Sequence, residues 1–85
     1  MRDAQGPEPT AVPLAMLERG RRARVLVVSG VTGFAQRLAS FAILPGAEIQ
    51  VLSDAPVGPL MLSVREAGRV ALGRGMAGRI LVEPL

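Results

Sequence analysis

The sequence predicts a small, mainly β domain: a partly open barrel of about five short strands, with one short helix between the first and second strands. The chain has 85 residues, enough for one core, and 49% of them are hydrophobic. Ten glycines and seven prolines indicate many turns, which suit short strands better than long helices. Closing short strands into a barrel would also protect most of their exposed edges.

The beginning of the chain contains little that would order it. Residues 1–12 combine proline, glycine and charged residues without periodicity, so we expect a disordered tail ahead of a domain that spans residues 13–85. Residues 22–29 then form an apolar, β-branched run that is typical of a buried strand. We take this run as the first strand of the barrel.

One helix is expected over residues 32–44. Thr32 can cap its first turn, and Pro45 and Gly46 would end it. The apolar residues of this segment recur at positions i, i+4, i+7 and i+8, which places on one helical face Phe34, Leu38, Phe41 and Ala42.

After this helix the apolar period changes to two, as in half-buried strands. The alternation predicts strands around residues 49–51, 60–64, 70–72 and 80–82. We expect a proline-containing loop at residues 54–59 and a short 3₁₀ turn at residues 74–78. The predicted core is Val25, Val27, Phe34, Leu38, Phe41, Ile49, Val51, Leu62, Val64, Val70, Leu72, Ile80 and Val82.

Side chains that support catalysis or metal binding are scarce. The chain has no His, Cys or Lys, so its serines lack a basic partner for nucleophilic attack. Its carboxylates are scattered and predict no metal cluster. Gly73–Gly78 fits the dinucleotide-binding pattern G-x-G-x-x-G, but too few residues follow for the second parallel strand that this chemistry needs. We expect a non-enzyme without a cofactor.

The charge raises the question of nucleic-acid binding. The net charge is +3 and the pI is about 11.4. Every basic residue is Arg, so a small basic excess is enough to raise the pI this far. Small barrels that bind nucleic acid usually add aromatic stacking residues, whereas Phe34 and Phe41 are expected in the core. We therefore expect no nucleic-acid partner, and keep a nucleic-acid-binding barrel as an alternative.

An apolar surface for another protein is the kind of site that remains. The candidates lie near the helix exit, in the proline-containing loop and on the last strand: Leu44, Pro45, Val57, Leu60, Met61 and Leu81. Weak homo-oligomerisation is compatible with such a surface. Because no apolar stretch is long enough to span a membrane and the start does not read as a signal peptide, we expect a cytoplasmic location.

The order of these features resembles the ferrous iron transport protein A (FeoA) family over roughly residues 14–82. The most specific segment is QRLASFAILPGAEI at residues 36–49, which is similar to the family pattern R-L-x-x-L-G-h-x-P-G-x-x-h, where h is apolar. The family usually has Leu-Gly where this chain has Phe41-Ala42, which predicts a slightly different exit from the helix. The loop before the last strand is also unusually rich in glycine.

The resemblance implies an SH3-like barrel that acts beside a FeoB-type ferrous iron permease and binds or regulates its cytosolic GTP-binding domain. The chain would then reach the inner face of the membrane only through this partner. The same domain occurs at the C-terminus of iron-dependent repressors, so a stand-alone regulatory domain related to them is a further alternative. By the resemblance, the family signature includes Arg37, Ala42, Pro45 and Gly46, which form no catalytic site.

Overall fold

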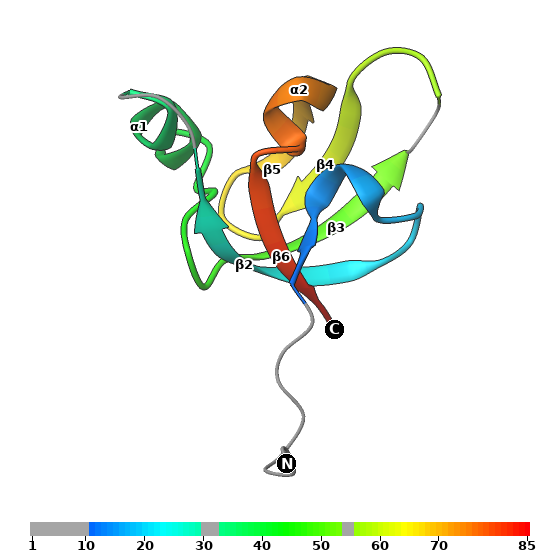
Figure 1. The fold of residues 1–85 in the computed structure, drawn as a ribbon, viewed down its shortest axis with the longest axis horizontal. Coiled ribbons are helices and arrows are strands. Elements are labelled where there is room, and N and C mark those ends of the chain that lie inside the picture. Colours follow the sequence, from blue (N-terminus) through cyan, green and yellow to red (C-terminus); the bar gives the residue numbers. More distant parts are fainter. Residues whose placement is uncertain (1–10, 30–32, 54–55) are drawn as a thin grey trace, which may run out of the picture.

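The structure is a computed structural model that describes residues 11–29, 33–53 and 56–85. The expected tail up to residue 10, the expected cap at Thr32 and the start of the expected loop at residues 54–55 lie outside these ranges. Within them the chain forms, in order, β1 (Val12–Pro13), the 3₁₀ helix η1 (Leu14–Met16), β2 (Arg22–Val28), α1 (Phe34–Ala39), β3 (Glu48–Ser53), β4 (Leu60–Val64), β5 (Gly68–Leu72), α2 (Arg74–Ala77) and β6 (Ile80–Pro84). Figure 1 shows the strands wrapping into a curved sheet with the helices toward one end.

The described strands form one antiparallel sheet in the order β1-β6-β2-β3-β4-β5. The predicted mainly β class, with a short helix after the first long strand, is confirmed. The structure has six strands in the described residues instead of about five, because Val12 and Pro13 pair with Val82 and Leu81 of β6. A strand of two residues leaves no alternation for sequence reasoning to detect.

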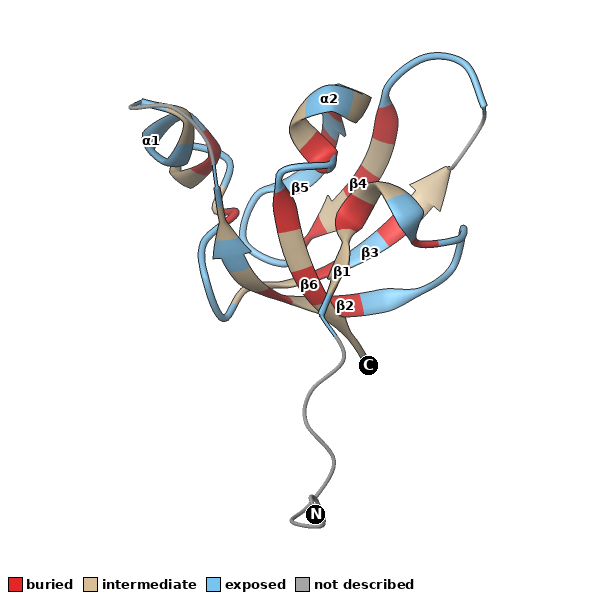
Figure 2. Ribbon diagram, viewed as in Figure 1, coloured by how far each residue is buried: buried red, intermediate tan, exposed pale blue. Residues whose placement is uncertain are grey.

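The barrel encloses a single apolar core, and Figure 2 shows buried positions recurring along the strands. Burial alternates strictly along β4, because successive side chains of a strand point to opposite faces. In the described part of the chain no polar or charged residue is buried. The core consists of Leu14, Leu17, Ala23, Val25, Leu38, Ile43, Ile49, Val51, Leu60, Leu62, Val64, Val70, Leu72, Ala77, Ile80 and Val82.

Two residues of the predicted core are at the surface: Val27 is 48% exposed and Phe41 is 39% exposed. The pairing of β2 with β6 shifts register between Val25 and Val27, and such a bulge displaces the inward–outward alternation by one residue. Phe41 lies beyond the end of α1, which is shorter than expected and ends at Ala39. It therefore does not continue the buried helical face.

Two short elements add core residues that the sequence patterns missed. Leu14 of η1 is fully buried, and η1 contacts both β6 and α2 at one end of the barrel. Residues 74–77 form a one-turn α-helix, α2, instead of the expected 3₁₀ turn, and its Ala77 is fully buried. Single helical turns are too short to show an apolar period, which explains why the patterns did not reveal these packing roles.

Ala42 closes the end of α1 in a left-handed backbone conformation, with φ of 63°. The N–H of Ile43 donates to the carbonyl of Leu38 at 3.0 Å, and the N–H of Ala42 donates to that of Ala39 at 2.9 Å. Helices commonly end in this way with glycine at the left-handed position, because a side chain there meets the backbone. The difference from the family pattern at this position is therefore a difference in backbone strain.

We expect Ala42→Gly to raise the free energy of unfolding by about 0.5–1 kcal/mol. Alanine loses about 1–2 kcal/mol in the left-handed region, and the greater freedom of glycine in the unfolded chain offsets part of the gain. Urea denaturation measures the change. Ala35→Gly, at an exposed position inside α1, is the matched control and should lower stability by about 0.5–1 kcal/mol. Equal losses in the two variants would contradict the role of Ala42.

Candidate protein-binding surface

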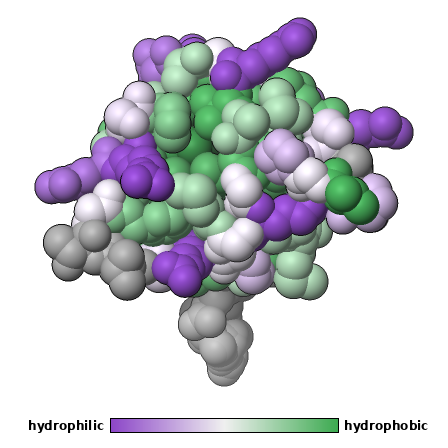
Figure 3. All heavy atoms as spheres, turned by 90° about the horizontal axis from the view of Figure 1, so that it is seen from above, coloured by the Kyte–Doolittle hydropathy of each residue, from purple (hydrophilic) through white to green (hydrophobic). Residues whose placement is uncertain are grey.

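Three large apolar side chains are exposed around the end of α1. Val27 at the end of β2 is 48% exposed, Phe41 is 39% exposed and Leu44 is 47% exposed. We call these three residues the α1 surface. Figure 3 shows, more broadly, that apolar residues gather in the middle of the face that carries the helices, with hydrophilic residues around them. Such a gathering of exposed apolar residues is a candidate contact for another protein.

Backbone hydrogen bonds hold the parts of the α1 surface together. The N–H of Gly46 donates to the carbonyl of Val25 at 2.7 Å, and the N–H of Val25 donates to the carbonyl of Ala47 at 2.8 Å. The segment that carries Leu44 is therefore fixed beside β2 at Val25, which precedes Val27 by two residues. The α1 surface is built before any partner arrives.

The first turn of α1 is fixed from another side. Phe34 is partly buried against the core, and the guanidinium carbon of Arg79 lies 6.0 Å from the centroid of its ring. A cation at this distance over an aromatic face is attracted by the ring. The N–H of Ser29 also donates to the carbonyl of Arg79 at 2.9 Å, which ties the end of β2 to the start of β6. These contacts orient α1 relative to the barrel.

The structure does not bring all the predicted partner-binding residues together. Leu44 and the exposed Pro45 lie side by side at the α1 surface. Val57 is 85% exposed, but it lies in the loop before β4, which Figure 1 places on the opposite side of the molecule from α1. Partner binding by Val57 would therefore need a second contact region.

The other three predicted residues belong to strands. Leu60 is fully buried, so its prediction as a surface contact is wrong: it opens β4 and pairs with the buried Leu72 of β5. Met61 and Leu81 are each half-buried on β4 and β6, which lie apart in the sheet. Met61 lies apart from the α1 surface, whereas Leu81 lies directly opposite Val27 in the register of β2 and β6 and therefore shares its face of the sheet.

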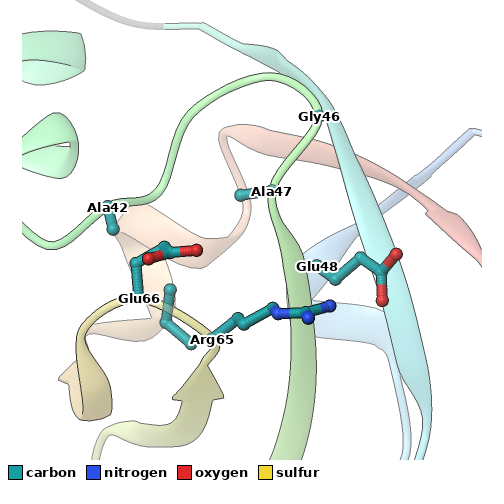
Figure 4. Close-up of a pocket in the computed structure, with 7 residues that line it drawn as sticks. Ala42, Gly46, Ala47, Glu48, Arg65 and Glu66 are labelled. Atoms are coloured by element: carbon teal, nitrogen blue, oxygen red, sulfur yellow. The ribbon is translucent and has the colours of Figure 1, made fainter.

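A shallow hollow of about 310 Å³ lies between the segment after α1 and the turn after β4 (Figure 4). A second hollow of about 230 Å³ continues over the outer side of the sheet and shares Glu48 and Arg65 with the first. The first is lined by Ala42, Gly46, Ala47, Glu48, Val64, Arg65 and Glu66. Sequence reasoning missed this region, because it forms only when β3 pairs with β4.

A network of ion pairs crosses strands β2, β3 and β6 beside these hollows. The carboxylate of Glu48 lies 3.4 Å from the guanidinium of Arg22 and 3.7 Å from that of Arg24. Arg24 also approaches Glu83 at 3.5 Å. Exposed pairs of this kind add little stability, but they neutralise the charge of Glu48. In the described part of the chain Arg65 makes no ion pair.

The described residues include no group of three or more His, Cys, Asp or Glu that could hold a metal ion. Nor do they include a helix long and apolar enough to cross a membrane. What the surface does offer is apolar contact at α1 and charge around the hollows. Proteins bind other molecules through such features. The fold and the surface together define the class of this protein: a small SH3-like barrel with an exposed apolar surface.

Comparison with known proteins makes the class specific. The sequence model of the FeoA domain matches residues 12–84. Over 71 residues the chain is 34% identical to a protein of Methanocaldococcus jannaschii named putative Fe(2+) transport protein A, and the match covers 84% of each chain. This chain belongs to the FeoA family.

Solved structures agree with this assignment. The crystal structure of an iron uptake regulatory protein (FeoA) superposes with a TM-score of 0.83 at 39% identity, and the match covers 89% of this chain and 100% of the other. A manganese-dependent transcriptional repressor also superposes with a TM-score of 0.83, at 27% identity. That match covers 98% of this chain but 46% of the repressor, so the similarity extends over less than half of the larger protein.

Proposed function

We propose that this chain is a non-catalytic accessory protein of ferrous iron uptake, which acts in the cytoplasm by binding the cytosolic GTP-binding domain of a FeoB-type permease. Membership of the FeoA family supports the link to iron transport. The observation that carries the binding role is the α1 surface, whose members Val27, Phe41 and Leu44 are 48%, 39% and 47% exposed. The proposal includes no catalysis, because the chain lacks His, Cys and Lys.

The α1 surface has the properties of a preformed contact. Its apolar side chains would lose water-exposed area on binding, which is the main favourable term in protein association. The side chain of Leu38 in α1 is fully buried, and the hydrogen bonds of Gly46 and Ala47 fix the segment after α1 to β2. Little backbone ordering would then oppose association. The chain would be recruited to the membrane through the permease.

Leu44→Asp should weaken binding to the permease domain by at least about tenfold, because a carboxylate in an apolar contact is desolvated without a partner. Isothermal titration calorimetry with the purified GTP-binding domain measures the change. Val57→Asp, at an 85% exposed position on the opposite side of the barrel, is the matched control and should bind like the unmodified chain.

Thermal denaturation of both variants separates lost contact from lost folding, and both should melt near the unmodified chain because both positions are exposed. Two results would contradict the proposal. One is an unchanged affinity for Leu44→Asp. The other is the absence of any association by the unmodified chain at concentrations on the order of 50 μM.

A second candidate function is favoured by the structural match to the manganese-dependent repressor. In that case the chain would be a detached regulatory domain, and the α1 surface would contact a metal-sensing repressor instead of a permease. Helix-turn-helix sequence in the same reading frame, or binding of a repressor that Leu44→Asp abolishes, would favour this function. Selective binding to the permease domain would exclude it.

A further inference from the structure

A polar row crosses the outer face of the barrel next to the hollows. In the register of strands β2 to β5, Arg22 lies opposite Gln50, Gln50 opposite Ser63, and Ser63 opposite Arg69. Directly opposed residues in neighbouring strands share a face of the sheet. Arg22, Gln50 and Arg69 are exposed, so this face is the outer one.

Arg65 extends this row toward α1. It lies just beyond the end of β4 and lines the second hollow together with Gln50 and Ser63. It lines both hollows, and Figure 4 shows its side chain extending along them toward Glu48. The carboxylate of Glu48 is already shared by two other arginines, at 3.4 and 3.7 Å. Within the described residues, neither Arg65 nor Arg69 has an ion-pair partner.

We infer that this part of the outer face binds an extended acidic segment of a partner protein, whose carboxylates contact Arg65 and Arg69. We call Gln50, Ser63, Arg65 and Arg69 the basic trough. Arginine binds a carboxylate through two parallel hydrogen bonds, and such charge-assisted bonds are stronger than neutral ones. The hydroxyl of Ser63, which lies opposite Arg69 in the register of β4 and β5, can donate to the same segment.

The position of the trough indicates which protein supplies the acidic segment, and this step rests on the proposed function. The first hollow reaches from Arg65 to Ala42 and Gly46. These two residues flank Leu44 in the chain, so the trough lies next to the segment that carries Leu44. A permease domain seated on the α1 surface would have its next segment over the trough. The apolar residues would anchor the partner, and the arginines would select and steer an acidic one.

The charges around the trough favour an acidic protein over a nucleic acid. Glu66 lines the first hollow, and its carboxylate would repel a continuous run of phosphates there. A protein segment can space its carboxylates to meet the arginines and avoid Glu66. Neither hollow is lined by an aromatic residue on which bases could stack.

A peptide titration tests the trough independently of the permease. The probes are two synthetic ten-residue peptides, one of alternating Glu and Ser and one of alternating Gln and Ser, added to the ¹⁵N-labelled chain. We expect the Glu peptide alone to shift the amide resonances of Gln50, Ser63, Arg65 and Arg69. The double variant Arg65→Glu, Arg69→Glu should lose these shifts, whereas Arg37→Glu on exposed α1 should keep them.

Shifts spread evenly over all surface arginines, or unchanged in the double variant, would overturn the inference. Stronger shifts at the same residues with a ten-nucleotide oligodeoxythymidylate would replace the acidic segment with nucleic acid. Arg65→Glu removes one charge-assisted hydrogen-bonded pair between the trough and its partner. It should therefore lower the affinity for the permease domain about tenfold, with a smaller effect at high salt.

These experiments distinguish a failure of the trough proposal from a failure of the proposed function. If Leu44→Asp abolishes permease binding while Arg65→Glu leaves it unchanged and the Glu peptide does not bind, the trough is wrong and the proposed function stands. If the Glu peptide binds at the trough but the permease domain does not bind at all, the proposed function is wrong and the trough stands.

Discussion

Leu38→Ala is expected to lower the free energy of unfolding by about 2–5 kcal/mol, because it removes a fully buried side chain and leaves a cavity. Leu38 is the buried residue of α1, and it accepts through its backbone the hydrogen bond from Ile43 that closes the helix. Small domains are stable by only about 5–15 kcal/mol in total. The loss would therefore be a large fraction of the stability of this chain.

The matched control for Leu38→Ala is Leu44→Ala, the same chemical change at a 47% exposed position. It should cost less than about 1 kcal/mol, since much of its area already contacts water. Urea denaturation followed by circular dichroism measures both variants. If both changes destabilise the chain equally, Leu38 does not anchor α1 and Leu44 is not a surface residue.

Leu60→Ala should also cost about 2–5 kcal/mol, which separates a core role from the partner-binding role that the sequence suggested. Leu60 is fully buried and lies opposite the buried Leu72. Val57→Ala, three residues earlier in the loop, should change stability by no more than about 0.5 kcal/mol.

Thermal denaturation of Leu60→Ala and Val57→Ala, together with their affinity for the permease domain, distinguishes a core role of Leu60 from a partner-binding role. The burial of Leu60 predicts a lower melting temperature, with the affinity of the folded fraction unchanged. Full thermal stability combined with weakened binding would show that Leu60 lies at the surface after all.

The strands could be predicted because their burial is a local pattern. Alternation along residues 60–64 and 80–82 fixes which side chains point inward, and β4 and β6 show that alternation. The helix was located for the same reason, although Ala42 adopts a left-handed conformation and α1 ends sooner than its apolar spacing suggested. Local periodicity determines where an element lies better than where it stops.

The errors occur where distant parts of the chain decide the outcome. Val27 is turned outward by a bulge in its pairing with β6, and no residue near it in the sequence announces that bulge. Leu60 follows a loop with two prolines and so resembled a surface residue, but its position opposite Leu72 places it in the core. In both cases sheet register overrides the local signal.

The candidate site was predictable in part for similar reasons. Leu44 and Pro45 stood out because a helix stop leaves apolar residues without a helical face to join. Val27 joins them only through the hydrogen bonds between β2 and the segment after α1. The trough around Arg65 depends on the pairing of β3 with β4 and on the ion pairs of Glu48, neither of which sequence spacing reveals.

The central claim, that the α1 surface contacts the permease, is tested most directly by titrating the ¹⁵N- and methyl-labelled chain with the unlabelled GTP-binding domain. We predict that the largest changes in chemical shift occur at Val27, Phe41 and Leu44, and that Val57 is unaffected. Saturable shifts centred on Val57, with Val27, Phe41 and Leu44 unchanged, would contradict the account.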